Sequence, residues 1–398
     1  MAKNSQKRMA LDMDNFSIPT KIFFGNDVLD HLSELDAKRV LIVTDPFIVK
    51  SGLLDMIVHP LENGKIDYTV FSDVVPDPPI KKIVLGVKAL LDYKPEIVIA
   101  LGGGSAIDST KAIREFATTT EGYPRIPMIA IPTTSGTGSE VTSFAVITDS
   151  DKHVKYPLIS PSLLPDEAIL DAELVRTVPP AITADTGMDV FTHALEAFVS
   201  INENEFSSAF AEKAIQIVGN NLLRCFYDGD DMEARLKMHL ASCLAGLAFN
   251  SAGLGLNHGM AHALGAHFHI PHGRANAMIL PHVIQFNANI SKHSKSQRSY
   301  PLIVSRYSRI AQNLGLTSYN EIMTVRSLAN WVQFMCREMD VELSVSQWAK
   351  NTGKITEEEY FAAIPAMADE ALADNCTKAN PRKVTRANVI ELYKKLWY

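Results

Sequence analysis

The sequence contains little cysteine, and the few thiols it has are not arranged for cross-links. Its 398 residues include only four cysteines, at positions 225, 243, 336 and 376, with no C-x-x-C pair and no regular spacing. This pattern indicates neither a disulfide framework nor a thiolate zinc site. We therefore expect a reducing compartment.

Long apolar runs and an excess of positive charge are also absent. The N-terminus lacks the apolar core of a secretory signal, and no later apolar run approaches the ~20 residues of a membrane span. The formal net charge is −7, and no dense stripe of lysine and arginine overrides it locally. We expect a cytoplasmic protein that binds neither membranes nor nucleic acid.

What is present is the composition of a globular enzyme, with 46% hydrophobic and 21% charged residues. A chain of 398 residues is too long for one ordinary hydrophobic core, so two domains are expected. A polar N-terminal tail over residues 1–17 precedes them. The sequence leaves the role of this tail open between a disordered extension and a short targeting helix.

The first part of the chain alternates short apolar runs with helical segments. Runs rich in β-branched residues recur up to about residue 172, and amphipathic stretches separate them. This alternation predicts a parallel, Rossmann-like sheet covered by helices, together with a β-hairpin. The predicted strands are Val40–Thr44, Tyr68–Phe71, Ile97–Leu101 and Met128–Ile131, the helices are Lys81–Asp92 and Ser105–Phe116, and the hairpin pairs Glu140–Asp149 with His153–Ile159.

The pattern changes at Pro179 and Pro180. After them β-branched runs become rare, and stretches rich in Ala, Leu and Met with a period of about 3.6 residues continue to the C-terminus. An α/β domain over residues 18–180 and an all-helical domain over residues 181–398 are therefore expected. The predicted helices are Thr183–Ser200, Ser207–Arg224, Asp231–Phe249, His258–His267 and Val325–Met339, with His239 expected to be an ordinary core or surface residue.

A glycine-rich turn follows the buried run Ile97–Leu101. Gly102, Gly103 and Gly104 lead into a predicted helix that Ser105 can cap. Backbone without side chains can approach a pyrophosphate closely, and the N–H groups and dipole of a helix start favour its negative charge. The turn lacks the full G-x-G-x-x-G pattern, so by itself it fits a plain strand–helix turn equally well.

Two further polar segments follow strands of the same predicted sheet. Asp45 ends the run RVLIVTD, where a carboxylate can bind an adenosine ribose and repels a 2′-phosphate, which favours NAD over NADP. The loop over residues 132–140, PTTSGTGSE, follows Met128–Ile131. Because ligands bind beyond the carboxyl ends of parallel strands, three polar strand ends favour a nucleotide site over three unrelated turns.

Histidines gather in one short stretch of the helical half. Five of the twelve lie between His258 and His272, and His258 and His262 share one helical face, as do Asp189 and His193. Imidazole and carboxylate donors suit divalent iron or zinc, and three or four protein ligands with an open position are typical of catalytic sites. A single pair of this spacing more often caps a helix or bonds within a polar core, but the two motifs in one helical domain favour a metal site, and we predict Asp189, His193, His258 and His272 as its ligands.

Several motifs together resemble the iron-dependent (group III) alcohol dehydrogenase family. GGGSAIDSTKAI, AIPTTSGTGSEVT, TGMDVFTHALEAFVS and the histidine-rich AGLGLNHGMAHALGAHFHIPHGRANAMILP occur in the order and spacing of that family, and the likeness runs from about Ile18 to the C-terminus. The resemblance implies a dehydroquinate synthase-like fold, a small alcohol or aldehyde as substrate, and a homodimer or larger homo-oligomer. It also implies Fe2+ and NAD(H) as cofactors, with Zn2+ as the alternative metal.

Within that family the chain is most similar to the branch that reduces propionaldehyde to 1-propanol in propanediol-utilisation microcompartments. ALEAFVS, KYPLI and IPAM carry this similarity. It implies that the enzyme regenerates NAD+ inside a bacterial microcompartment, with an aldehyde dehydrogenase or a shell protein as partner.

The resemblance also assigns roles to individual residues. It implies the same four metal ligands and makes His262 a neighbouring residue that relays protons without binding the metal. Phe249 and Cys376 are implied to line the substrate pocket. The implied cofactor contacts are Asp45, Gly102, Gly103, Gly104, Ser105, Asp108, Thr133, Thr134, Ser135, Thr137, Thr142 and Lys155.

Two other classes of function share these features. A metal-dependent lyase or hydrolase on the related fold would use the nucleotide only structurally or transiently, with no net change in nicotinamide absorbance. A binding module would hold metal or nucleotide without turnover. Among dehydrogenases, lactaldehyde, 1,3-propanediol, ethanol and butanol remain alternative substrates.

Overall fold

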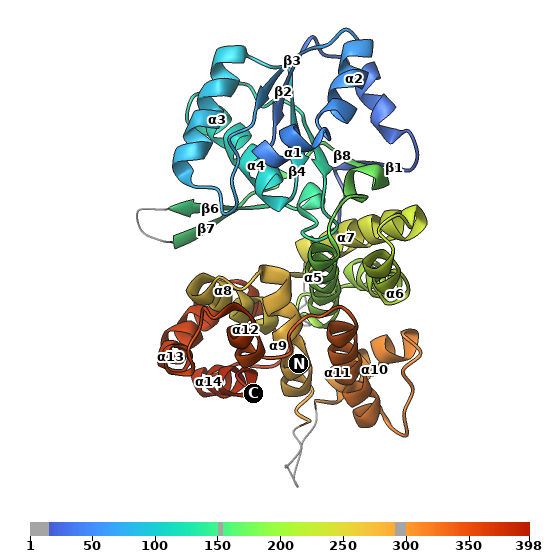
Figure 1. Ribbon diagram of the computed structural model, residues 1–398, viewed down its shortest axis with the longest axis vertical. Coiled ribbons are helices and arrows are strands. Elements are labelled where there is room, and N and C mark those ends of the chain that lie inside the picture. The colour runs from blue at the N-terminus through green and yellow to red at the C-terminus, as the bar shows by residue number, and fades with distance from the viewer. Residues whose placement is uncertain (1–15, 150–153, 291–299) are drawn as a thin grey trace, which may run out of the picture.

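The computed structural model describes residues 16–149, 154–290 and 300–398, which form a sheet-containing lobe followed by a helical lobe (Figure 1). Residues 1–15 of the predicted tail lie outside the described residues. Six parallel strands form one sheet in the order β1-β8-β5-β4-β2-β3. They are β1 Lys21–Phe24, β2 Arg39–Val43, β3 Asp67–Phe71, β4 Ile97–Gly102, β5 Met128–Pro132 and β8 Glu167–Leu170.

Helices cover both faces of this sheet, which confirms the predicted α/β architecture (Figure 1). Along β2, Val40 and Ile42 pack into the layer that holds α1 and α2, whereas Leu41 and Val43 pack into the layer of α3 and α4. Burial on both faces explains why the strands read as unbroken apolar runs. These helices are α1 Pro46–Ser51, α2 Asp55–Asn63, α3 Ile80–Tyr93 and α4 Gly104–Thr119.

The predicted hairpin is present, formed by β6 Phe144–Asp149 and β7 Val154–Ile159. Its first strand begins later than predicted, because Glu140 lies in the short 3-10 turn Ser139–Val141 instead of in a strand. The Nζ atom of Lys111 donates hydrogen bonds to the carbonyl oxygens of Thr142 and Phe144, 2.8 and 2.7 Å away. The chain before β6 therefore folds around a buried ammonium group.

The helical lobe begins where the sequence changes character. β8 ends at Leu170, and α5 starts at Pro180, a residue suited to a first helical turn because its fixed φ matches the helix and no N–H is needed there. No single helix of the described chain combines the length and hydropathy of a membrane span. The helices are α5 Pro180–Val199, α6 Glu205–Tyr227, α7 Met232–Ala252, α8 Leu256–Phe268, α9 His272–Asn287, α10 Pro301–Asn313, α11 Glu321–Glu338, α12 Val345–Thr352, α13 Glu357–Ala373 and α14 Arg386–Leu396.

Candidate active site at the junction of the two lobes

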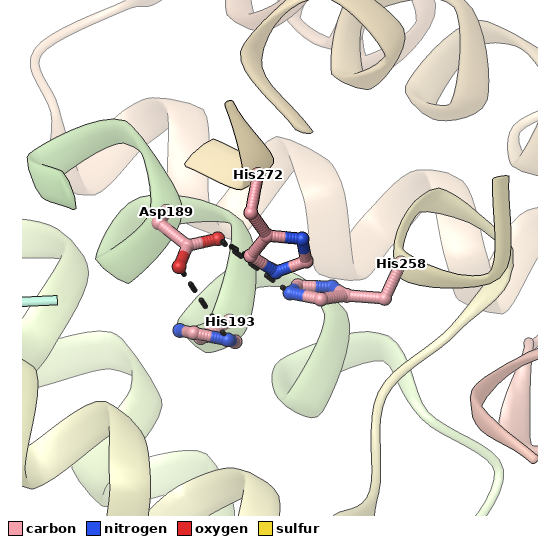
Figure 2. A group of neighbouring side chains, drawn as sticks. All are labelled: Asp189, His193, His258 and His272. Atoms are coloured by element: carbon pink, nitrogen blue, oxygen red, sulfur yellow. Dashed lines mark ion pairs between the residues drawn. The ribbon is translucent and has the colours of Figure 1, made fainter. Parts of the chain in front are cut away.

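The four predicted ligands come together in the helical lobe. Asp189 and His193 lie one turn apart on α5, His258 lies in the first turn of α8, and His272 is the first residue of α9. Their side chains point toward one centre (Figure 2), and one donor atom from each lies within 4.8 Å of all the others. The Nε2 atoms of His193, His258 and His272 lie 4.0, 3.7 and 3.6 Å from the Asp189 carboxylate. The side chain of His272 is 40% exposed, which leaves one side of an otherwise buried centre open.

The donor set fits a divalent cation. The amide nitrogen of Asn276 lies 2.7 Å from Asp189 Oδ1, 3.1 Å from His258 Nε2 and 3.2 Å from His272 Nε2. An amide nitrogen has only two protons, so three acceptors converge on a point that offers too few donors. One carboxylate oxygen with imidazole nitrogens is a ligand combination that iron and zinc accept.

Electrostatics favour positive charge at this centre. Burial raises the pKa of the Asp189 carboxyl, but the neighbouring His193 and His272 outweigh it and hold that pKa well below its usual range. Burial lowers the pKa of His193 to about 4, so its ring keeps a lone pair at neutral pH. Burial also lowers the pKa of His258, but the carboxylates of Asp189 and Glu196 outweigh it and raise the pKa to about 9. The two carboxylates therefore favour a positive charge beside them, which either a proton on His258 or a divalent cation can supply; a cation that replaces this proton leaves the ring neutral with a lone pair at Nε2.

Two buried contacts around the centre were not predicted from the sequence. Glu196 on α5 accepts a hydrogen bond from Nδ1 of His258 at 2.6 Å. Asn257 donates to Oδ1 of Asn276 at 2.9 Å, which turns the Asn276 amide nitrogen toward the ligands. The available signal was the spacing of Glu196, three residues after His193 and hence near the same helical face.

His262 lies beside the centre without joining it. Its ring stacks on His272 with centroids 5.2 Å apart, and its Nδ1 donates to Oδ2 of Asp374 at 2.8 Å. Asp374 also accepts from the backbone N–H of Cys376 at 2.7 Å. Burial raises the pKa of Asp374, but His262 outweighs it and lowers the pKa to about 2. Asp374 therefore stays ionised and orients His262, a role that the sequence analysis missed.

The two residues predicted to line a substrate pocket both border this centre. The ring of Phe249, in the last turn of α7, lies 4.6 Å from the ring of His193, and the ring of Phe144 lies 6.5 Å from that of Phe249. The Sγ atom of Cys376 lies within 4.8 Å of donor atoms of His262 and Asp374. Burial raises the pKa of the Cys376 thiol well above its usual value, so the group is a neutral thiol.

The three polar strand ends lie side by side, because β2, β4 and β5 are neighbours in the sheet. A Cβ on Gly102 would lie 3.5 Å from Oδ2 of Asp45, and the Thr133 N–H donates to the Gly102 carbonyl at 3.1 Å. Gly102 has a φ of +147°, a value that side-chain-bearing residues rarely adopt. A Cβ on Gly104 would lie 2.8 Å from Cγ2 of Thr137, so the glycine-rich turn directly faces the loop over residues 132–140.

The cap of α4 differs from the prediction. Ser105 is the second helical residue, and the extended residue before the helix is Gly103, so Ser105 does not cap it. The first N–H groups of α4 accordingly have no side-chain acceptor from the N-cap, as a phosphate site at a helix start requires. Asp45 caps α1, since its Oδ1 accepts from the backbone N–H groups of Phe47 and Ile48 at 2.8 and 3.1 Å.

Two predicted cofactor contacts belong to a network around Lys111. Oδ1 of Asp108 accepts from the Ser139 hydroxyl at 2.6 Å, and Nζ of Lys111 donates to the hydroxyls of Ser139 and Thr142 at 2.9 and 3.1 Å. Asp108 and Thr142 thus tie α4 to the end of the loop over residues 132–140. The side chain of Lys155, another predicted contact, lies outside the part of the chain whose side chains are described.

The loop over residues 132–140 connects the glycine-rich turn to the metal-binding helices. A Cβ on Gly136 would lie 2.9 Å from Cβ of Thr186, which is three residues before Asp189 on α5. The hydroxyl of Ser135 lies 3.0 Å from Nδ1 of His239 on α7, so this histidine anchors the loop. Of the other predicted contacts on the loop, Thr133 is buried, and Thr134 is half-buried. The glycine-rich turn and the four converging side chains are therefore linked through this loop.

A sheet lobe with a glycine-rich turn at its strand ends, joined to helices that converge three histidines and an aspartate, has the organisation of a metal-dependent dehydrogenase. Comparison with known families agrees: residues 19–172 match the iron-containing alcohol dehydrogenase family, and residues 183–397 match the C-terminal domain of the Fe-containing alcohol dehydrogenase family. The chain belongs to the iron-containing alcohol dehydrogenase family, whose members are oxidoreductases acting on alcohols.

Individual relatives extend over nearly the whole chain. The 1-propanol dehydrogenase PduQ of Salmonella typhimurium is 43% identical over 387 residues, covering 96% of this chain and 100% of the relative. The NADPH-dependent butanol dehydrogenase of Clostridium saccharobutylicum is 35% identical over 401 residues, covering 97% and 98%. A crystal structure of a 1,3-propanediol oxidoreductase superimposes with a TM-score of 0.87 at 30% identity, covering 97% of this chain and 100% of that one.

Proposed function

We propose that this alcohol dehydrogenase is an iron-dependent, NAD(H)-linked enzyme that reduces propionaldehyde to 1-propanol. The observation that carries the proposal is the convergence of Asp189, His193, His258 and His272 beside the aromatic ring of Phe249, at the junction with the nucleotide cradle. The identity of 43% to a 1-propanol dehydrogenase over its full length supports the choice of substrate.

The sheet lobe binds and orients the cofactor in this proposal. The backbone at Gly103 and Gly104 receives the pyrophosphate at the start of α4, and the free Oδ2 of Asp45 accepts a hydrogen bond from the adenosine ribose. When bound, the metal supplies Lewis-acid polarisation of the substrate oxygen, and the nicotinamide supplies or accepts the hydride. The chain itself provides position and a site with restricted access to water.

A proton must reach the substrate oxygen during reduction of the aldehyde, and His262 is placed to deliver it. Its ring lies against His272, and its side chain is 45% exposed, so it contacts both the centre and solvent. Because Nδ1 is held by Asp374, proton exchange takes place at Nε2. Replacing His262 with alanine is expected to lower kcat about 100-fold while metal content stays unchanged. A loss of metal in this variant would instead make His262 a ligand.

The pocket beside the centre selects for an unsubstituted alkyl chain. Phe144 and Phe249 present aromatic carbon next to His193. A hydroxyl group buried against such a wall without a partner costs about 1–3 kcal/mol. We therefore expect kcat/KM for propionaldehyde to exceed that for lactaldehyde by about 10-fold or more.

The decisive experiment follows NADH consumption by anaerobically purified protein with propionaldehyde, lactaldehyde and butyraldehyde. The assay is run before chelation, after chelation, and after separate addition of Fe2+ and Zn2+, and it is repeated with NADPH. Activity restored best by Fe2+, with NADH and propionaldehyde preferred, supports the proposal. Preference for lactaldehyde contradicts the substrate, and NADH binding without turnover under either metal favours the lyase or binding-module alternatives.

We propose further that residues 18–180 and 181–398 are the cofactor-binding and metal-binding domains of a homodimer or larger homo-oligomer. It would act inside a cytoplasmic microcompartment, beside an aldehyde dehydrogenase that uses the regenerated NAD+. This proposal depends on the resemblance of the sequence motifs. Light scattering of the purified protein tests the oligomer, and retention of the chain in isolated compartments of the producing cell tests its location.

A further inference from the structure

The carboxylate of Glu196 occupies a position that contacts both a helix start and a ligand side chain. Glu196 is on α5, and its side chain is almost completely buried, with an exposed fraction of 5%. Its Oε1 accepts from the backbone N–H of Asn257 at 2.7 Å, and its Oε2 lies 3.3 Å from the backbone nitrogen of His258. The N-cap residue of α8, Gly255, has no side chain, so Glu196 from another helix provides the acceptors that this helix start needs.

The same carboxylate fixes the imidazole of His258. Nδ1 of His258 donates to Oε2 of Glu196 at 2.6 Å, and the backbone N–H of His258 donates to the same oxygen. A proton held at Nδ1 leaves the lone pair of the neutral ring at Nε2. That atom is the one that faces Asp189 and Asn276, 3.7 and 3.1 Å away. Glu196 therefore sets both the rotation of the ring and the nitrogen that it presents to the centre.

We propose that Glu196 is the positioning residue of the metal centre: it holds His258 with Nε2 directed at the ion and thereby sets the affinity of the centre for divalent metal. A carboxylate behind a ligating histidine raises the basicity of the ring and restricts its orientation. This inference rests on the metal centre proposed above and deepens it. Removing such a partner weakens metal binding by about 10–100-fold.

The structure offers a second way to disturb the same contact without removing the charge. A Cβ added at Gly255 would lie 2.6 Å from Oε1 of Glu196, closer than a side chain tolerates. Gly255 has a φ of −142°, which alanine adopts without strain. Gly255→Ala is therefore expected to displace the carboxylate from His258 without removing any titratable group from the chain.

The test compares the wild type with Glu196→Gln and Gly255→Ala, and uses Glu203→Gln as a matched control. Glu203 follows the same helix and binds Arg306 and Ser208, both outside the metal centre. The dissociation constant for Zn2+ is measured by competition with a chelator, the coordination of Co2+ by its visible absorption, and Tm with saturating Zn2+ and after chelation. We expect both site variants to bind Zn2+ about 10–100-fold more weakly with an altered Co2+ spectrum, whereas Glu203→Gln lowers Tm without changing the Zn2+ affinity.

The outcomes separate this inference from the function on which it rests. If the wild type binds neither Zn2+ nor Co2+, the proposed metal centre is wrong. If the wild type binds both and the two site variants match its affinity, Glu196 is only a helix cap and the inference is wrong, while the metal centre stands. If the two site variants lower Tm by the same amount with and without Zn2+, Glu196 is likewise only a helix cap. If Glu196→Gln does not fold, the Zn2+ affinity and Co2+ spectrum of Gly255→Ala decide the question.

Discussion

Replacing Gly273 with alanine should separate α5 and α9, two helices that carry three of the four proposed metal ligands. A Cβ at this position would lie 2.0 Å from the backbone oxygen of Asp185 and 2.6 Å from its carbonyl carbon. Both are backbone atoms of α5, so no side chain can move out of the way. An ordinary contact begins at 3.4 Å, so the start of α9 must move away by about 1.4 Å. His272, the adjacent residue, moves with it.

This displacement is large compared with what a metal centre tolerates. Ligand distances vary by only about 0.2 Å in working sites, so a shift of this size removes His272 from the ligand set. One ligand of four accounts for about 3 kcal/mol of a typical zinc site, or about 100-fold in affinity. Overpacking itself costs about 1–3 kcal/mol, which lowers Tm by on the order of 5 °C.

The assay is the Zn2+ dissociation constant by chelator competition, together with Tm in the presence and absence of Zn2+. Gly265→Ala on α8 serves as the control, because the nearest atom to its Cβ is the backbone oxygen of Ile270 at 3.3 Å. This control should keep the wild-type affinity and gain up to about 1 kcal/mol from the higher helix propensity of alanine. A Gly273→Ala protein that binds Zn2+ as tightly as the wild type would refute the reasoning.

Three further predictions concern the sheet lobe. Burial raises the pKa of Glu140 to about 7, so the folded protein accommodates this carboxyl while it is protonated and loses stability as the pH rises through that value. In urea unfolding, the wild type should therefore lose on the order of 2 kcal/mol relative to Glu140→Gln between pH 5 and pH 8. Parallel pH profiles of the two proteins would contradict this. Asp45→Ala should lower the free energy of unfolding by about 1 kcal/mol, because α1 loses its N-cap. It should also raise kcat/KM with NADPH relative to kcat/KM with NADH by about 10-fold. An unchanged ratio of the two kcat/KM values would show that Asp45 does not contact the ribose. Lys111→Met should lower the free energy of unfolding in urea by about 3 kcal/mol, because Asp108 and the carbonyl of Thr142 lose their buried cation. The same variant should have a higher KM for NADH. An unfolding curve equal to that of the wild type would count against this network.

The features that the sequence predicted are those with short-range periodicity. Asp189 and His193 lie four residues apart, so any helix through them places both on one face. Four of the six sheet strands were located within one residue at either end. Three of them, β2, β4 and β5, are buried and read as apolar runs, whereas β3 was located from its β-branched and aromatic residues although none of them is buried. Asp189 and His193 could be grouped for the same reason, since a helix brings residues of this spacing together whatever surrounds them; that the four side chains bind a metal stays a prediction.

The features that the sequence did not predict depend on contacts between distant segments. Glu196 and His258 are 62 residues apart in the sequence, and His262 and Asp374 are 112 residues apart. No local pattern distinguishes these carboxylates from others on a helix or in a loop. The order of the strands escapes prediction for the same reason, since it is decided by which chain segments pack together. Ser105 was wrongly expected to cap α4 because a serine after glycines fits a cap equally well by sequence, and only the backbone shows that the helix starts one residue earlier.

Close approaches at glycine occur at three contacts around the candidate site. Gly273 places the start of α9 on α5, Gly255 admits the Glu196 carboxylate to the start of α8, and Gly136 brings the cofactor loop against Thr186. At Gly273 the contact is with backbone atoms of Asp185, which cannot change rotamer, whereas at Gly255 and Gly136 it is with the side chains of Glu196 and Thr186. All three approaches are closer than a Cβ would permit, so glycine at these positions sets how near the segments lie. It follows that conservative substitutions among the apolar core residues of the helical lobe should change stability before they change metal affinity. Alanine at any of these glycines should disturb the geometry of the site even in a protein that remains folded.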